Sequence, residues 1–273
     1  MLTENTMERL RILTESAKYD VSCSSSGTVR SGKKGMVGNT VGGVGICHSF
    51  ADDGRCISLL KVMLTNSCMY DCAYCVNRRS NDIPRATLSV TELVDITMEF
   101  YRRNYIEGLF LSSGVVRNPD YTMERLVAIV RKLRTEHRFN GYIHLKSIPG
   151  ASQELLSQAG LYADRMSVNI EIPKEESLKL LAPEKDHQSV FQPMKLIQQG
   201  VLENKEDRRR FHHAPRFVPA GQSTQMIVGA TKETDRDILT MSSMLYGQPT
   251  MRRVYYSGYI SVNTYDSRLP VLK

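Results

Sequence analysis

The chain of 273 residues carries a formal net charge of +7, and 41% of its residues are hydrophobic. This length corresponds to one large domain or somewhat more, and no apolar run approaches the roughly 18 residues of a membrane span. The N-terminal stretch MLTENTMERLRIL has charged residues where a signal peptide has its apolar segment, which predicts a cytoplasmic protein. The basic charge permits a polyanionic partner, but a merely basic soluble protein would carry it too.

The first 56 residues are predicted to consist of a helix and an irregular segment. Residues 1–20 have a helical pattern, whereas residues 22–45, SCSSSGTVRSGKKGMVGNTVGGVG, are rich in Gly and Ser and lack apolar periodicity. Such a long irregular segment is either a linker or a functional loop. We therefore divide the chain into an N-terminal extension, residues 1–56, and a folded unit, residues 57–273.

Short apolar segments alternate with helical ones from residue 57 onward. A helix is expected after the capping box of Ser89 and Glu92, and another, 187–199, is expected to stop at Gly200 because glycine is typical of helix ends. The expected strands are 58–64, 108–112, 141–147, 165–171, 224–229 and 253–259. Six strands alternating with helices predict a parallel α/β sheet, and because a closed barrel of this kind has about eight, we expect an open or partial barrel.

Three cysteines, Cys68, Cys72 and Cys75, follow the first expected strand in one short loop. Such a grouping in a cytoplasmic chain indicates metal or redox chemistry rather than disulfides. A structural zinc site would need a fourth ligand, and downstream only the adjacent His212 and His213 resemble a ligand pair. Cys thiolates are the usual ligands of a 4Fe–4S cluster, and three of them would leave one iron free for a small molecule. The residues favour such a cluster, with a zinc site or a fortuitous grouping as alternatives.

The spacing C-x3-C-x2-C, with the aromatic Tyr74 directly before the last cysteine, resembles the signature of the radical S-adenosylmethionine (SAM) superfamily. The resemblance covers roughly residues 57–260 and implies a partial (β/α)6 barrel. It implies a 4Fe–4S cluster whose open iron binds SAM, and reductive cleavage of SAM to a 5′-deoxyadenosyl radical that abstracts hydrogen from a substrate. An electron donor such as flavodoxin or ferredoxin is implied as well.

Three longer runs, CMYDCAYCVNRRSNDIPRAT, YRRNYIEGLFLSSGV and HAPRFVPAGQSTQMIVGAT, resemble one subfamily. It is described as a group of DNA modification or repair radical SAM proteins associated with a uracil-DNA-glycosylase-like partner, which implies such a role and such a partner here. Its members usually continue into a helical C-terminal region, which we expect to be absent because this chain stops at DSRLPVLK. The alternatives are a non-catalytic iron–sulfur or zinc protein that binds nucleic acid, and a radical enzyme acting on a protein or small metabolite.

The resemblance also implies where SAM would bind. It places the methionyl amine at a turn after the second expected strand, the ribose at polar residues ending the fourth, and the adenine at the fifth. An ordinary strand-to-helix turn is the alternative for the first of these. Asn169 and Glu171 are two residues apart and share one strand face, where unpaired polar groups are costly. The implied cofactor-binding residues are Tyr74, Ser112, Ser113, Gly114, Asn169, Glu171, Ile227 and Gly229. Lys146, Tyr256 and Ser257 also end expected strands, where ligands gather in α/β folds.

The remaining cysteines, Cys23, Cys47 and Cys56, flank the Gly-rich segment. Unpaired cysteines in a reducing compartment are often inert small hydrophobes. Cys23 and Cys47, however, lie in polar, glycine-rich surroundings rather than in apolar stripes. A second iron–sulfur cluster on these three residues and inert thiols are therefore the two interpretations.

The segment 205–222, KEDRRRFHHAPRFVPAGQ, is the densest basic stretch. Guanidinium groups donate paired hydrogen bonds to phosphates, and the rings of Phe211 and Phe217 would suit stacking on exposed bases. Another basic pair follows the cysteine loop directly. The predicted nucleic-acid contacts are Arg78, Arg79, Arg208, Arg209, Arg210 and Arg216. A solvated charge run is the alternative interpretation of the longer segment.

Overall fold

The computed structural model describes residues 3–20, 46–50 and 56–270 of the chain. The irregular segment expected at 22–45 lies outside these residues. Cys23 also lies outside them, and only the backbone of Cys47 and Cys56 is described, so the second cluster stays a prediction.

One seven-stranded sheet, with its strands in sequence order, forms the centre of the molecule. Its strands are β1 (Ile46–Phe50), β2 (Cys56–Met63), β3 (Gly108–Ser112), β4 (Tyr142–Lys146), β5 (Arg165–Ser167), β6 (Gln222–Val228) and β7 (Met251–Gly258). Strands β2 to β7 are parallel, and β1 adds an antiparallel edge that the sequence analysis did not predict. The expectation of six parallel strands in an open partial barrel is confirmed.

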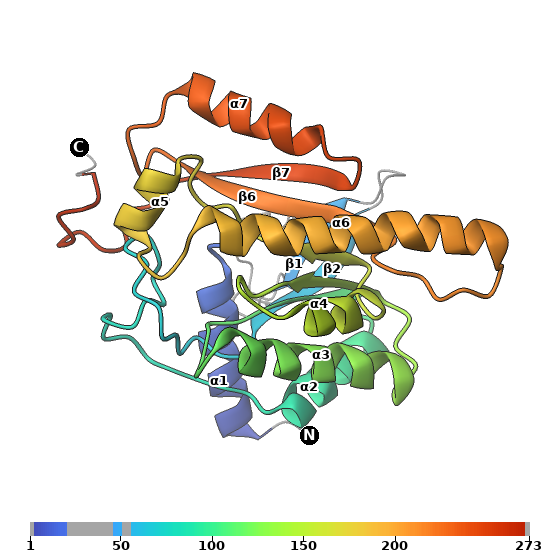
Figure 1. Ribbon diagram of the computed structural model, residues 1–273. Helices are drawn as coiled ribbons and strands as arrows, with labels where there is room; N and C mark the ends of the chain where they lie inside the picture. Colours follow the sequence, from blue (N-terminus) through green and yellow to red (C-terminus); the bar gives the residue numbers. More distant parts are fainter. Residues whose placement is uncertain (1–2, 21–45, 51–55, 271–273) are drawn as a thin grey trace.

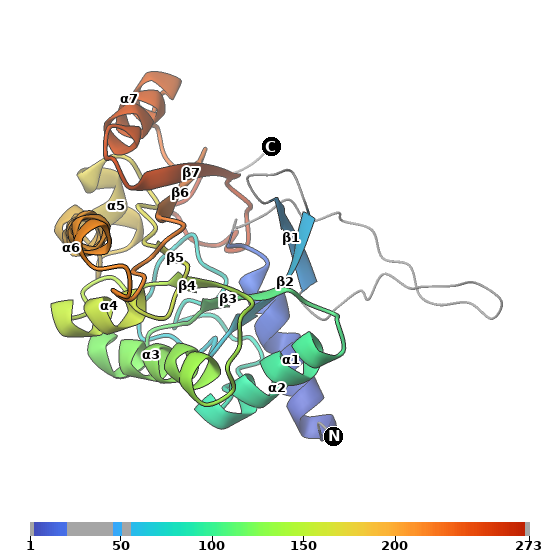
Figure 2. The same ribbon diagram turned by 90° about the vertical axis from the view of Figure 1, so that its right-hand side faces the viewer.

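Helices α2, α3, α4, α6 and α7 cover the outer face of the curved sheet (Figure 1), as Figure 2 shows from the side. The helices are α1 (Glu4–Ala17), α2 (Val90–Arg102), α3 (Pro119–Thr135), α4 (Gln153–Gly160), α5 (Glu175–Leu181), α6 (His187–Arg210) and α7 (Asp235–Tyr246). Helix α2 begins with the expected capping box of Ser89 and Glu92. No helix in the described ranges is long and apolar enough to cross a membrane.

Helix α1 packs onto the sheet rather than standing apart from it. Its side chains Leu10, Leu13 and Ala17 are fully buried in the same hydrophobic core as Leu60 and Val62 of β2. The burial of these apolar groups fixes α1 beside β2, so the residues that follow the helix are carried to the edge of the barrel.

Helix α6 continues through Gly200 to Arg210, so the prediction that it stops at Gly200 is wrong. The glycine is required for space. A Cβ atom added there would lie 2.6 Å from Cε1 of Phe217, and one added at Gly160 of α4 would lie 2.2 Å from Cε2 of the same ring. The Phe217 ring therefore packs between α4 and α6, where it is not available to stack on a base.

Candidate functional site

A cavity of about 470 Å³ lies at the edge of the sheet where the parallel strands end. This volume is within the range of small-molecule sites, and ligands in open α/β sheets bind at this edge. The cavity is walled by the loop after β2, the turn after β3, the ends of β4 to β7, the residues after α1 and the segment after β7.

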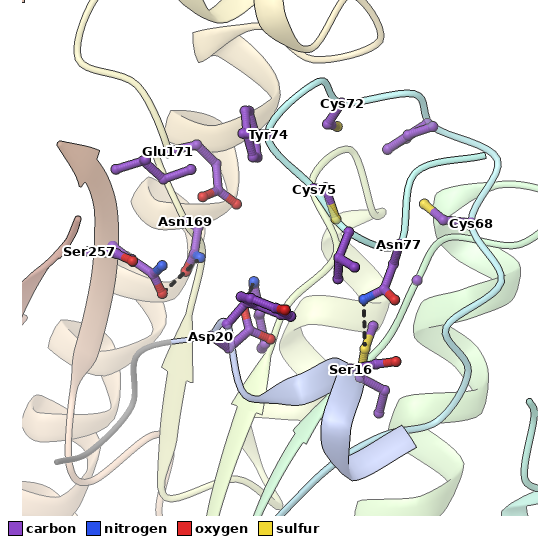
Figure 3. A pocket seen from close by; sticks show the side chains of 18 of the residues that line it. Ser16, Asp20, Cys68, Cys72, Tyr74, Cys75, Asn77, Asn169, Glu171 and Ser257 are labelled. Atoms are coloured by element: carbon purple, nitrogen blue, oxygen red, sulfur yellow. Dashed lines mark hydrogen bonds and ion pairs between the residues drawn. The ribbon is translucent and has the colours of Figure 1, made fainter. Parts of the chain in front are cut away.

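Cys68, Cys72 and Cys75 all line this cavity, and Figure 3 shows them on one loop at one side of it. All three are free thiols, with Cys72 buried and the other two partly buried. Burial, reinforced by the nearby charge of Cys72, raises the pKa of the Cys75 thiol to about 12. Burial likewise raises the pKa of Cys72. Burial thus favours the protonated thiols, and a bound metal centre would have to displace their protons.

The chemistry of the three thiols suits an iron–sulfur cluster. Thiolates are the usual ligands of a 4Fe–4S cubane, and the three come from one loop at one side of the cavity. A structural zinc site would need a fourth ligand. The donor set therefore fits a cubane with three protein ligands.

The segment that carries the three cysteines, residues 66–86, is called the cysteine loop below. The turn after β3 packs closely against it. Val115 N–H lies 3.4 Å from Sγ of Cys68, and Met69 N–H donates to Val115 O at 2.7 Å. A Cβ atom added to Gly114 would lie 2.3 Å from the carbonyl oxygen of Ser67, so only glycine permits this approach. Ser113 and Gly114 line the cavity. Ser112 is buried at the end of β3 and is not among the lining residues.

Asn169 and Glu171 lie on the opposite side of the cavity (Figure 3). Strand β5 ends at Ser167, so the expected strand to residue 171 is too long. Glu171 instead has a φ of 62°, a backbone conformation that costs free energy for a residue with a side chain. Hydrogen bonds from Glu171 N–H to Gln225 O (3.0 Å) and from Ile227 N–H to Glu171 O (2.7 Å) hold it there. The side chains of Glu171 and Asn169 both line the cavity.

Lys185, between α5 and α6, is a site residue that sequence reasoning missed. Its Nζ lies 3.7 Å from Oε1 of Glu171 and 3.4 Å from the hydroxyl of Tyr74. Burial opposes the charged form, but the nearby groups of Tyr74, Cys72 and Glu171 raise the pKa of Lys185 well above its usual value. The site therefore holds a fixed ammonium beside the cysteine loop. The run EKDH around it resembles any exposed loop, so no local signal distinguishes it.

A second ion pair closes the side of the cavity nearest α1. The carboxylate of Asp20 pairs with Lys146 at the end of β4, and Lys61 donates to the carbonyl of Asp20. Both Asp20 and Lys146 line the cavity. Lys146 was noted from the sequence, whereas Asp20, which follows α1, was not.

Of the other residues that the sequence analysis placed at strand ends or at the cofactor, some line the cavity and some do not. Tyr74, Ile227 and Ser257 line the cavity. Gly229, which follows β6 with a φ of 87°, is not among the lining residues. The hydroxyl of Tyr256 instead donates to Oγ of Ser242 at 2.7 Å.

The arginines predicted to contact nucleic acid are not brought together. Arg78 is largely buried in an ion pair with Asp266, and Arg208 donates to the carbonyl of Ala214 at 2.5 Å. Arg79 is exposed on the cysteine loop itself, after Cys75. Arg209, Arg210 and Arg216 are exposed at or just beyond the C-terminal end of α6. Figure 1 shows that end of α6 far from the cysteine loop.

Residues 62–245 match the Radical SAM superfamily, whereas no curated protein matches the chain. Among solved structures, HydG, a maturase of the FeFe-hydrogenase, matches with a TM-score of 0.55 at 13% identity, over 77% of this chain and 45% of that one. The FeFe-hydrogenase maturase HydG from Carboxydothermus hydrogenoformans matches with a TM-score of 0.58 at 15% identity, over 75% and 45%. Methylornithine synthase (PylB) matches with a TM-score of 0.55 at 16% identity, over 76% and 56%.

This chain thus spans about half the length of those proteins. At such identities the likeness concerns the fold alone, while the match over residues 62–245 covers most of the chain. The protein therefore belongs to the radical SAM superfamily, whose members are enzymes that use a 4Fe–4S cluster and SAM.

Proposed function

We propose that this radical SAM enzyme holds its cluster on Cys68, Cys72 and Cys75 and acts in DNA modification or repair. The observation that carries the proposal is the placement of the three thiols at one side of a cavity of about 470 Å³, with Asn169 and Glu171 on the other side. That volume suits SAM together with part of a substrate.

The residues around the cavity suit the parts of SAM. The ring of Tyr74 and the side chain of Ile227 offer apolar contact to the adenine, and Asn169 and Glu171 offer hydrogen bonds to the ribose hydroxyls. The turn after β3 would hold the methionyl group, with Ser113 and Gly114 at the cavity and Ser112 buried directly before them. Gly229 directly follows β6, the strand that carries Ile227, and would let the backbone turn away from the adenine.

Cys68, Cys72 and Cys75 would hold the cluster, which, when bound, would supply an electron from a flavodoxin- or ferredoxin-type donor for the reductive cleavage of SAM and hydrogen abstraction from the substrate. The protein's part is to orient SAM and to keep water from the cavity.

A DNA substrate is supported by the resemblance of the longer sequence runs, by the net charge of +7 and by the exposed Arg79 on the cysteine loop. The same resemblance supports a uracil-DNA-glycosylase-like partner. Buried thiols that must remain reduced to bind a cluster support a cytoplasmic location.

The test uses anaerobically reconstituted protein, SAM and dithionite. Deuterated DNA should transfer deuterium to 5′-deoxyadenosine, and replacement of the three cysteines with Ala should abolish iron binding at this site and SAM cleavage. SAM cleavage in the triple variant would overturn the assignment of the cluster ligands. Cleavage by the unaltered protein without deuterium transfer from any DNA would instead point to a protein or small-metabolite substrate.

A further inference from the structure

The segment after β7, residues 259–269, lies along the cysteine loop, and we refer to it as the C-terminal strap. Figure 1 shows it in red beside the loop that carries the cysteines. It lies outside the range that matches the superfamily, residues 62–245.

Asn263 of the strap uses its whole side chain on the cysteine loop. Its Nδ2 donates to the carbonyl of Ala73 at 2.6 Å and to the carbonyl of Cys75 at 3.0 Å. Its Oδ1 accepts a hydrogen bond from Nδ2 of Asn81 at 2.7 Å. The residue is 7% exposed, so these bonds are shielded from water. Breaking them would leave buried polar groups unpaired, which is costly.

Two further contacts fix the strap to the same loop. The carboxylate of Asp266 pairs with both Arg78 and Arg268. Leu269 is buried in a small hydrophobic cluster that includes Cys72 and Ala73 of the loop. The strap is thus held by hydrogen bonds, charge and apolar burial at three positions along its length.

The cysteine loop needs such support because residues 66–86 contain no helix or strand. Backbone polar groups in an irregular segment must find partners elsewhere. Arg85 is the hydrogen-bond partner of four backbone carbonyls in this segment. It donates to those of Asn66, Asn77, Arg78 and Asn81. The carbonyls of Ala73, the neighbour of Cys72, and of Cys75 itself accept hydrogen bonds from Asn263.

We infer that the C-terminal strap sets the positions of Cys72 and Cys75 around the cluster, with Asn263 as the positioning residue. The inference rests on the proposed ligation of the cluster by Cys68, Cys72 and Cys75. The strap also lines the cavity through Tyr259, Ile260 and Val262. One segment therefore forms part of the cavity wall and fixes the cluster loop.

The test compares the full-length protein with Asn263→Leu and Asn263→Asp. Both changes remove the amide donor at similar side-chain size, one without charge and one with it. Thr264→Ala is the matched control, because Thr264 is the exposed neighbour of Asn263. Each protein is reconstituted anaerobically and assayed for iron and sulfide content, rate of iron release to a chelator, EPR spectrum of the reduced cluster, and unfolding temperature without the cluster.

Both Asn263 variants should release iron about tenfold faster than the unaltered protein, in line with the effects of residues that support metal ligands. Their EPR spectra should change, while Thr264→Ala matches the unaltered protein in every assay. Normal iron retention and an unchanged spectrum in both variants would overturn the inference. An unaltered protein that binds no cluster would refute the proposed ligation itself, which distinguishes the two failures. If Asn263→Asp does not fold, Asn263→Leu decides alone, and a spectrum unchanged in Asn263→Leu counts against the inference.

Discussion

Lys185 and Glu171 form an ion pair at the side of the cavity, with 3.7 Å between Nζ and Oε1. The two residues are brought together by different features. Glu171 is turned inward by its left-handed backbone, and Lys185 comes from the connection between α5 and α6. The side chain of Glu171 is only 9% exposed and that of Lys185 only 14%, so each charge offsets the cost of removing the other from water.

Replacement of Lys185 with Met should therefore destabilise the protein by about 3 kcal/mol, because it leaves a buried carboxylate without its partner. The double variant Lys185→Met/Glu171→Gln should lose clearly less than the sum of the two single changes. Urea unfolding of the full-length chain measures these free energies. Strictly additive effects would show that the two side chains do not interact.

Asp20 gives the stability a dependence on acid pH. Burial alone would raise the pKa of Asp20, but the ammonium groups of Lys146 and Lys61 lower it below its usual value. The unfolded carboxyl titrates near pH ~4. The folded state thus binds the proton less tightly than the unfolded state, so the pair's contribution is complete above about pH 4 and is lost as pH falls through the folded-state pKa.

The variant Asp20→Asn should be less stable than the unaltered protein at neutral pH. As the pH falls below about 4, it should lose less of its stability than the unaltered protein does. Unfolding free energies measured across this pH range test the prediction, with Glu136→Gln, at the exposed residue directly after α3, as the control. An unchanged pH dependence in Asp20→Asn would show that other carboxyl groups are responsible.

Local patterns were sufficient to predict most of the sheet, because alternation and apolar runs are properties of neighbouring residues. The capping box at Ser89 was recognised for the same reason. The loop with three cysteines, together with the polar residues 169 and 171, indicated the side of the barrel that holds the cavity. Spacing along the chain was enough in these cases because each group lies within a short stretch directly after a strand.

Contacts between distant residues were not accessible in this way. Gly200 resembles a helix end in the sequence, yet it lies inside α6. A glycine is needed there because the ring of Phe217, from the loop after α6, packs against it. Lys185, Asp20 and Asn263 each lie in a loop or at a helix end, and only the folded chain places them at the cavity or against the cysteine loop. The hairpin of β1 and β2 was missed although the sequence ADDGR between them contains Asp53-Gly54, a dipeptide typical of hairpin turns.

Gly200→Ala tests this interpretation of α6. Alanine favours a helix over glycine by about 1 kcal/mol, but the added methyl group would lie 2.6 Å from the Phe217 ring. Because overpacking costs about 1–3 kcal/mol, we expect a net loss of stability that the second change Phe217→Leu partly restores. Thermal unfolding of the single and double variants measures it. A stabilising Gly200→Ala would mean that the ring moves aside at little cost.

The last prediction concerns the exposed arginines and DNA. Each phosphate contact that is removed should flatten the log–log dependence of DNA affinity on salt by about 0.9. Arg79 lies on the cysteine loop, whereas Arg209, Arg210 and Arg216 lie at the far end of α6. Since Arg78 and Arg208 are engaged in contacts within the protein, the informative variants are Arg79→Ala and the triple change Arg209/Arg210/Arg216→Ala.

Arg103→Ala is the matched control, because the exposed Arg103, directly after α2, forms an ion pair with Glu99 of that helix. Affinities for single- and double-stranded DNA at several salt concentrations give the slopes. We expect the control to keep the slope of the unaltered protein, Arg79→Ala to flatten it by about one unit, and the triple variant to flatten it further. A slope unchanged in both variants would exclude these arginines as phosphate contacts, and a protein without salt-dependent binding to either form of DNA would refute the nucleic-acid part of the proposed function. A change confined to the triple variant would place the DNA along α6, away from the cavity, and would require a base to reach the cluster from another part of the duplex or from another strand.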